Sequence, residues 1–110
     1  MDKTIDNKLK EFVKKTNEIL FADEIILFGS YAKGEQRESS DIDVAVIMND
    51  FKDDYLDFSA KLFYIVSKID NRIEPVLLVR THDKPGFIDH IKSYGKILFS
   101  RNLLSNKSIT

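Results

Sequence analysis

Two carboxylates one residue apart follow a glycine–serine pair at a fixed distance along the chain. Ten residues separate Gly29-Ser30 from Asp41-Ile42-Asp43, and an apolar run flanks the stretch on each side. Because alternate residues of a strand point to the same face, Asp41 and Asp43 are expected to share one face of a strand. Two carboxylates placed together at the mouth of a buried strand are costly unless a cation holds them.

The residue types around this pair favour Mg²⁺ as that cation. Mg²⁺ takes oxygen ligands, and it is usually bound by one or two carboxylates together with substrate phosphates. A tight turn at Gly29-Ser30 supplies such phosphates with backbone N–H donors, and Gly29 lets the backbone approach them closely. The plainer interpretation is an ordinary turn followed by two solvated acids, but it leaves two like charges on one face with nothing to hold them.

The elements that must position these residues follow from the apolar periodicity and the breaks in it. Helices are expected at residues 3–21, directly after Ser30, from Asp53 or Asp54 to Ile69, and at 87–94. Strands are expected at residues 24–28, 42–48, 72–80 and 96–100. Pro75 cannot donate to a ladder, so its strand is expected at a sheet edge or a bulge. The predicted fold is a two-layer α/β (α+β) domain, a small mixed β-sheet with helices packed on it.

The motif resembles the signature of the nucleotidyltransferase superfamily that includes polymerase beta. Residues 29–34 read Gly-Ser-Tyr-Ala-Lys-Gly and residues 40–44 read Ser-Asp-Ile-Asp-Val, and both agree with the short form of that signature, the minimal nucleotidyltransferase (MNT). The resemblance spans roughly residues 24–99. It implies the nucleotidyltransferase core fold and a third carboxylate on a later strand, which Glu74 offers in this chain.

The resemblance also implies a reaction, the transfer of AMP from ATP to a hydroxyl with release of pyrophosphate. Such reactions depend on positioning and on neutralising the charge of the triphosphate. Two Mg²⁺ ions are expected, with Asp41 and Asp43 holding the one on the triphosphate and sharing the second. Glu74 completes the second metal site or helps to deprotonate the attacking hydroxyl. Ser30 and Gly29 contact the nucleotide phosphates.

Composition sets the outer bounds of the interpretation. At 110 residues the chain is expected to form one domain over residues 1–100, with 101–110 as a loosely ordered tail. A net charge of −1 gives no reason to expect a direct nucleic-acid partner. The absence of cysteine excludes disulfides and zinc–thiolate sites. No apolar run is long enough to suggest a signal peptide or a membrane span, and a cytoplasmic location is expected.

The acceptor is expected to be another protein, because the core consumes the whole chain and leaves no second domain for an acceptor. The resemblance implies that this partner is a HEPN-domain toxin with ribonuclease activity, that the chain is its antitoxin, and that a tyrosine of the toxin receives the AMP. The alternative is a non-catalytic antitoxin that neutralises the HEPN ribonuclease by direct binding. An enzyme acting on a small-molecule hydroxyl lacks room for its acceptor.

Several residues have a structural interpretation beside the functional one. Glu74 would be merely structural if it were paired with Arg72 at a sheet edge. Lys33 and Arg37 lie near the expected triphosphate, although loop cations are usually just solvated. The two histidines have no ligand spacing and are expected to be surface residues. The helix expected to begin near residue 54 is apolar around more than half of its circumference, and the surplus is either covered by the first helix or the C-terminal segment, or exposed to a partner.

Overall fold

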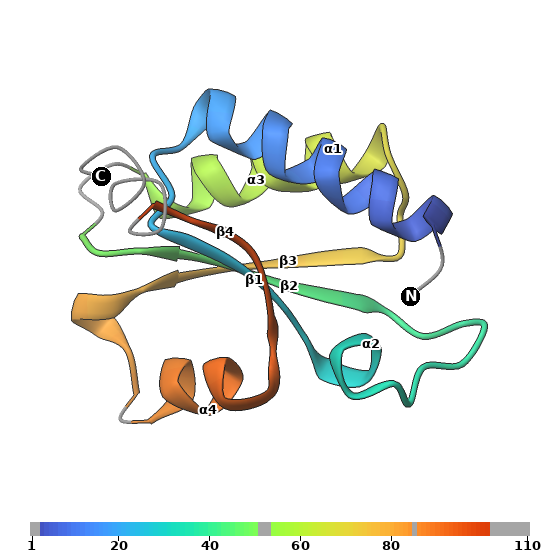
Figure 1. The fold of residues 1–110 in the computed structure, drawn as a ribbon. Coiled ribbons are helices and arrows are strands. Elements are labelled where there is room, and N and C mark those ends of the chain that lie inside the picture. Colours follow the sequence, from blue (N-terminus) through green and yellow to red (C-terminus); the bar gives the residue numbers. More distant parts are fainter. Residues whose placement is uncertain (1–2, 51–53, 85, 102–110) are drawn as a thin grey trace, which may run out of the picture.

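The computed structural model describes residues 3–50, 54–84 and 86–101, which form one four-stranded mixed sheet (Figure 1). The strands are β1 (Glu24–Phe28), β2 (Ile42–Met48), β3 (Ile73–Val79) and β4 (Lys96–Ser100), in the spatial order β3-β2-β1-β4. β1 runs antiparallel to both β2 and β4, whereas β2 and β3 are parallel. The predicted small mixed sheet is therefore confirmed.

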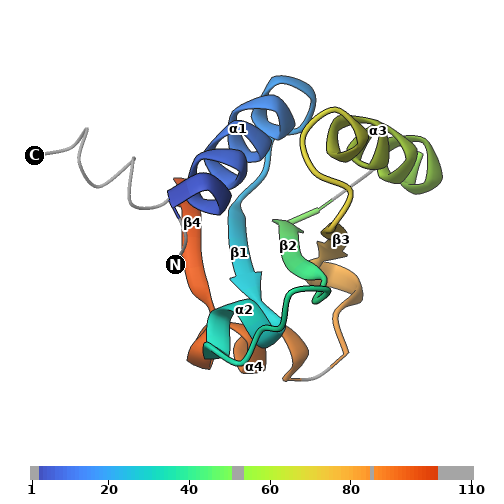
Figure 2. The ribbon, with the colours of Figure 1, turned by 90° about the vertical axis from the view of Figure 1, so that its right-hand side faces the viewer.

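Helices cover both faces of this sheet rather than one. α1 (Lys3–Ile19) and α3 (Tyr55–Ser67) lie on one face, and α4 (Phe87–Tyr94) lies on the other, beside the short α2 (Gly29–Lys33), as the two views in Figures 1 and 2 show. The prediction of two layers is wrong in this respect. The physical reason is that the central strands are apolar on both sides, so the side chains facing away from α1 and α3 also need a cover.

Two apolar clusters result from this arrangement. The larger one joins α1 and α3 to one side of the strands and includes Leu9, Phe12 and Leu62. The smaller one joins α4 to the other side, and its buried residues are Ile26, Ala45, Ile47, Ile88 and Ile91. Along β2, residues therefore alternate between the two clusters, as the period of a strand requires.

Local signals set the ends of the elements much as expected. The bounds of β1, β2, α4 and β4 agree with the prediction, α1 ends two residues earlier than expected, and β3 is one residue shorter at each end. β3 is an edge strand, which confirms the expectation from Pro75. Asp54 caps α3, because its side chain accepts a hydrogen bond from Asp57 N–H at 3.2 Å. Asp53, the other predicted cap, lies outside the described residues.

The apolar surplus of α3 is only partly covered. Leu62 and Val66 are buried, whereas Leu56, Phe63 and Tyr64 are 77%, 54% and 65% exposed. α1 packs against one side of α3, so part of the apolar surplus is covered and part is exposed. In residues 3–50, 54–84 and 86–101, no helix is both long and apolar enough to cross a membrane.

Candidate active site

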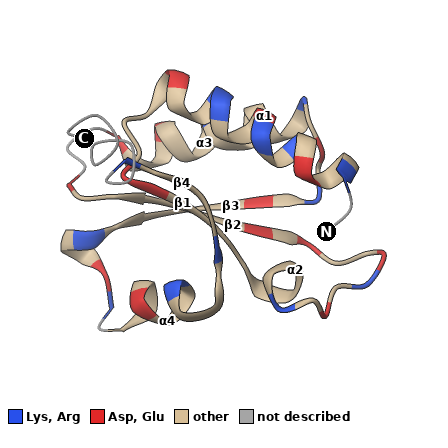
Figure 3. Cartoon of the chain, in the orientation of Figure 1, with Lys and Arg blue, Asp and Glu red and all other residues tan. Residues whose placement is uncertain are grey.

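Asp43 and Glu74 lie side by side on neighbouring parallel strands. They are register partners in the β2–β3 ladder, and Phe28 is the register partner of Asp43 on β1. Strand alternation places Asp43 on the same side as Ala45 and Ile47, and Glu74 on the same side as Leu78, which is the α4 side of the sheet. Figure 3 shows acidic residues at adjacent positions of β2 and β3. The predicted meeting of these two carboxylates is present in the structure.

Asp41 stands directly before β2, at the mouth of the predicted strand. β2 begins at Ile42, whose N–H donates to the carbonyl of Arg72 at 2.7 Å and so ties the beginnings of β2 and β3 together. Asp41 is exposed, whereas Asp43 is half-buried. The two side chains nevertheless interact, because the charge of Asp41 contributes to a raised pKa of Asp43.

The three carboxylates repel one another. Burial, followed by the charge of Asp41, raises the pKa of Asp43. The charge of Asp41 is the main cause of the raised pKa of Glu74, and burial, a hydrogen bond with Asp41 and the charge of Asp43 add to it. An ion pair between Glu74 and Arg72 would have the opposite effect, so the electrostatics favour the functional interpretation of Glu74.

This donor set fits a hard divalent cation. It consists of carboxylate oxygens, which Mg²⁺ prefers, and their mutual repulsion is the condition that a bound cation relieves. Asp41 interacts with both Asp43 and Glu74, and Asp43 also interacts with Glu74. Within the described ranges, no three or more acidic or histidine side chains form a ready-made metal-binding group. The assignment of Asp41, Asp43 and Glu74 as metal ligands therefore stays a prediction.

The carboxylate of Asp43 occupies the space that a side chain at position 29 would need. The φ of Gly29 is +70°, in the left-handed region, and an added Cβ would overlap with Oδ2 of Asp43 and lie 3.1 Å from Cγ. The glycine thus brings its backbone against the carboxylate. The sequence had suggested that Gly29 makes room for a phosphate, and the structure shows that the carboxylate itself takes up that room.

The hydrogen-bonding groups of the turn are divided between the protein and the solvent. Gly29 N–H donates to the hydroxyl of Tyr94 at 3.1 Å, so this predicted phosphate donor is already engaged. The hydroxyl of Ser30 has no hydrogen-bond partner among the described residues, and Ser30 is only half-buried. The predicted contacts of Ser30 and Gly29 with nucleotide phosphates stay predictions.

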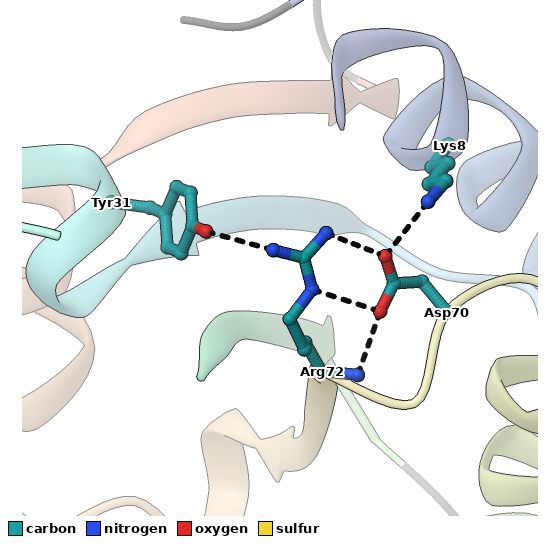
Figure 4. Close-up of polar contacts among 4 residues, drawn as sticks. All are labelled: Lys8, Tyr31, Asp70 and Arg72. Atoms are coloured by element: carbon teal, nitrogen blue, oxygen red, sulfur yellow. Dashed lines mark hydrogen bonds and ion pairs between the residues drawn. The ribbon is translucent and has the colours of Figure 1, made fainter. Parts of the chain in front are cut away.

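A cluster of charged side chains, with Tyr31 at its edge, connects α1 and α2 to the residues that precede β3 (Figure 4). The Asp70 carboxylate accepts hydrogen bonds from Lys8 Nζ at 2.9 Å and from Arg72 N, Nε and Nη2 at 2.8–3.1 Å. The side-chain hydrogen bonds from Arg72 are the main reason that the pKa of Asp70 lies far below its usual range. Arg72 Nη1 also makes a long contact of 3.5 Å with the hydroxyl of Tyr31. The cluster thus links α1, α2 and the residues that lead into Glu74.

Sequence reasoning missed Tyr94 and Asp70. Both act through partners distant along the chain, and no local motif marks them. Tyr31, to which the sequence assigned nothing, is buried in the main core with its hydroxyl facing Arg72. Lys33 is exposed and lies over the ring of Tyr94, with Nζ 4.8 Å from the ring centroid.

The remaining candidates lie on the surface. Arg37 N–H donates to Ser40 Oγ at 2.7 Å, which closes the turn that leads to Asp41. Both histidines are exposed, as expected. A cavity of about 650 Å³ opens at the opposite end of β3, between Tyr55, Val79 and Phe87. None of the three candidate carboxylates lines it.

A family model and a relative both match most of the chain. The family model described as polymerase beta, nucleotidyltransferase, matches residues 7–103. A protein of Methanocaldococcus jannaschii, provisionally named a protein adenylyltransferase, is 38% identical over 93 residues, which cover 79% of this chain and 91% of that protein.

Solved structures share the fold. A chain of a toxin–antitoxin complex with AMP-PNP matches with a TM-score of 0.60 and 27% identity, over 94% of this chain and 83% of that one. A chain in the complex of a tri-AMPylated Shewanella oneidensis HEPN toxin with an MNT antitoxin matches with a TM-score of 0.56 and 23% identity, over 94% of this chain and 77% of that one. A Sulfolobus solfataricus protein provisionally named a nucleotidyltransferase matches with a TM-score of 0.58 and 22% identity, over 93% and 91% of the two chains. At these identities, the last two show the fold alone.

Proposed function

Because the chain belongs to the polymerase beta nucleotidyltransferase family, we propose that it transfers AMP from ATP to a hydroxyl of a HEPN toxin and thereby acts as an antitoxin. The observation that carries the proposal is the placement of Asp43 between Gly29 and Glu74, with Asp41 beside them. The relative named as an adenylyltransferase supports AMP as the transferred group. The structural neighbour that contains AMP-PNP in a toxin–antitoxin complex supports the nucleotide and the setting.

Asp41, Asp43 and Glu74 are the residues that would hold Mg²⁺, with two ions expected. When bound, the metal would neutralise charge on the triphosphate and on the departing pyrophosphate. Ser30 would donate its hydroxyl to a phosphate oxygen. The carboxylates themselves are held in place by the β2–β3 ladder and by the close packing of Gly29 against Asp43.

The reaction balances as a single displacement. The acceptor oxygen forms a bond with the α-phosphorus, the bond between that phosphorus and the oxygen bridging to the β-phosphate breaks, and pyrophosphate leaves. The hydroxyl proton passes to a carboxylate of the site or to solvent. Glu74 is the candidate acceptor for this proton, unless it serves as a metal ligand alone.

The acceptor is proposed to be a tyrosine of the partner. In the described part of the chain, helices α1 to α4 pack on one sheet (Figure 1), and the proposal takes the acceptor hydroxyl from a second protein. A phenol, with a pKa of about 10, gives up its proton more readily than an aliphatic alcohol does. A tyrosine side chain is also long enough to enter the site while the backbone of the partner stays outside it.

A second candidate function is inhibition by binding alone. The exposed apolar face of α3, formed by Leu56, Phe63 and Tyr64, is the observation that favours it, because an exposed patch of large apolar side chains is typical of a protein interface. In this alternative, the chain covers the HEPN ribonuclease and does not modify it.

Labelled ATP separates nucleotidyl transfer from phosphoryl transfer. With a HEPN-domain protein and Mg²⁺, label from the α-phosphate of ATP should appear on the HEPN protein, and label from the γ-phosphate should not. Asp43→Asn should abolish the transfer, whereas Asp57→Asn, which changes an exposed residue of α3, should leave it unchanged. Transfer of the γ-label would overturn the assignment of AMP as the transferred group.

A further inference from the structure

Tyr94 reaches the glycine turn from the far end of the sequence. It is the last residue of α4, and its hydroxyl accepts the hydrogen bond from Gly29 N–H at 3.1 Å across 65 positions. The hydroxyl itself donates to no residue in the described part of the chain. The bond therefore satisfies the backbone of the turn and leaves the phenolic proton free for a further acceptor.

Gly29 is consequently held from two directions. The carboxylate of Asp43 fills the space where a side chain would be, and the hydroxyl of Tyr94 takes the N–H. These contacts fix the turn relative to both β2 and α4. A left-handed glycine without such contacts has more conformational freedom than any other residue, so the contacts determine where Ser30 points.

The ring of Tyr94 contacts the other end of α2, the short helix that begins at Gly29. Lys33, the last residue of α2, lies with Nζ 4.8 Å from the ring centroid, in cation–π range. His90 packs edge-on against the ring at 5.4 Å between centroids, one turn earlier on α4. One side chain thus contacts both the first and the last residue of α2.

We propose that Tyr94 is a positioning residue of the nucleotidyl-transfer site, and that its hydroxyl holds Gly29 so that Ser30 faces the phosphates of the nucleotide next to Asp43. The proposal rests on the proposed function for the identity of the ligand. It assigns a role in binding to a residue that lies outside the Gly-Ser and Asp-x-Asp motif.

The substitution Tyr94→Phe tests this proposal, because it removes the hydroxyl and keeps the ring that Lys33 and His90 contact. Tyr55→Phe is the matched control. Tyr55 also makes one hydrogen bond between its hydroxyl and the backbone, to the carbonyl of Leu77 at 2.7 Å, but it does so three residues farther along β3 than Glu74. Both variants lose one hydrogen bond between a tyrosine hydroxyl and the backbone, in which the hydroxyl of Tyr94 accepts and that of Tyr55 donates. A general loss of stability should therefore appear in both variants.

Two readouts decide the outcome. In the protein without nucleotide, amide exchange measured by NMR should become faster at Gly29 in Tyr94→Phe and stay unchanged there in Tyr55→Phe. The affinity for a non-hydrolysable ATP analogue with Mg²⁺ should fall by up to about tenfold in Tyr94→Phe, because binding must then order a turn that the lost hydrogen bond no longer holds. It should stay within twofold of wild type in Tyr55→Phe.

Unchanged exchange at Gly29, or tighter nucleotide binding by Tyr94→Phe, would overturn the proposal. Tighter binding would mean that the hydroxyl competes with a phosphate for Gly29 N–H. A wild-type protein that binds no nucleotide would contradict the proposed function instead, and the exchange at Gly29 would still decide whether Tyr94 holds the turn.

Discussion

Gly29 and Asp43 are packed so closely that the carboxylate of one residue fills the space that a side chain of the other would need. The contact joins the end of β1 to the beginning of β2, which are antiparallel neighbours. It means that the glycine of the Gly-Ser pair and the second aspartate of the motif, fourteen positions apart, form one structural unit. The spacing between them is therefore the length of chain needed to leave the sheet and return beside the same point.

Replacement of Gly29 should separate backbone strain from damage to the site. Gly29→Ala and Gly34→Ala both place a side chain in the left-handed region, at φ +70° and +73°, and each should cost about 1–2 kcal/mol of unfolding free energy. Only Gly29→Ala also displaces Asp43, because an added Cβ at Gly34 meets no atom within 4 Å. AMP-transfer activity should therefore fall in Gly29→Ala alone. The fall should be about a hundredfold or more, which is on the order of the effect of removing one group that stabilises charge in the transition state. Equal activities of the two variants in the AMP-transfer assay would contradict the packing argument.

Glu74→Gln should separate nucleotide binding from chemistry. Most of the affinity for the ATP analogue should remain, because Asp41 and Asp43 still face the triphosphate. Turnover should fall by about a hundredfold or more, as it does when a general base or a charge stabiliser is lost. Calorimetry measures the affinity and a turnover assay measures the chemistry. The control is Glu38→Gln, which changes an exposed acid in the loop between α2 and β2. A fully active Glu74→Gln variant would reduce Glu74 to a structural residue.

Asp41→Asn should stabilise the protein without nucleotide and weaken its function. The charge of Asp41 opposes the charges of both Asp43 and Glu74, so its removal relieves two repulsions in the folded state. The melting temperature without Mg²⁺ should therefore rise, while Mg²⁺-dependent affinity for the ATP analogue should fall. Wild-type affinity that is equal in EDTA and in Mg²⁺ would exclude the metal site.

Asp70 should make stability depend on pH in the acidic range. Its folded pKa lies below its unfolded value of about 3.9, so its contribution is complete above that value and is lost as the pH falls toward the folded pKa. Asp70→Asn should cost about 1.5–3 kcal/mol at pH 7, typical of hydrogen bonds to charged groups. In urea unfolding, the difference from wild type should shrink below about pH 4. A difference that is constant from pH 7 to pH 3 would contradict this role, and Asp57→Asn is the exposed control.

The sequence predicted those parts of the fold that depend on local signals. Gly95 ends α4 where expected, and the strand that carries Asp43 begins and ends as its apolar run indicates. The second helical layer was missed because an apolar strand shows that both of its faces are buried, and not which element buries each of them. Asp41 directly precedes the strand, as the predicted start at Ile42 indicates.

The candidate site was predictable where a motif carries it and unpredictable where distant residues support it. Gly29, Ser30, Asp41 and Asp43 lie within one stretch of fifteen residues, and Glu74 joins them because β3 pairs with β2 in register. The hydrogen bond from Gly29 to Tyr94 joins residues 65 positions apart, and no periodicity or spacing encodes it. The motif predicts that the Gly-Ser turn offers backbone N–H donors to phosphates, and it does not reveal that Gly29 N–H is bound to Tyr94.

The mass of the partner tests the central claim most directly. This protein, a HEPN toxin, ATP and Mg²⁺ are incubated together, the toxin is separated from this chain, and its intact mass and ribonuclease activity are measured. The account predicts a mass increased by one or more AMP units and a ribonuclease that stays inactive after this chain is removed. The contrary result is an unchanged mass, with inhibition that requires a stoichiometric complex and persists when Asp41 and Asp43 are both replaced by Asn.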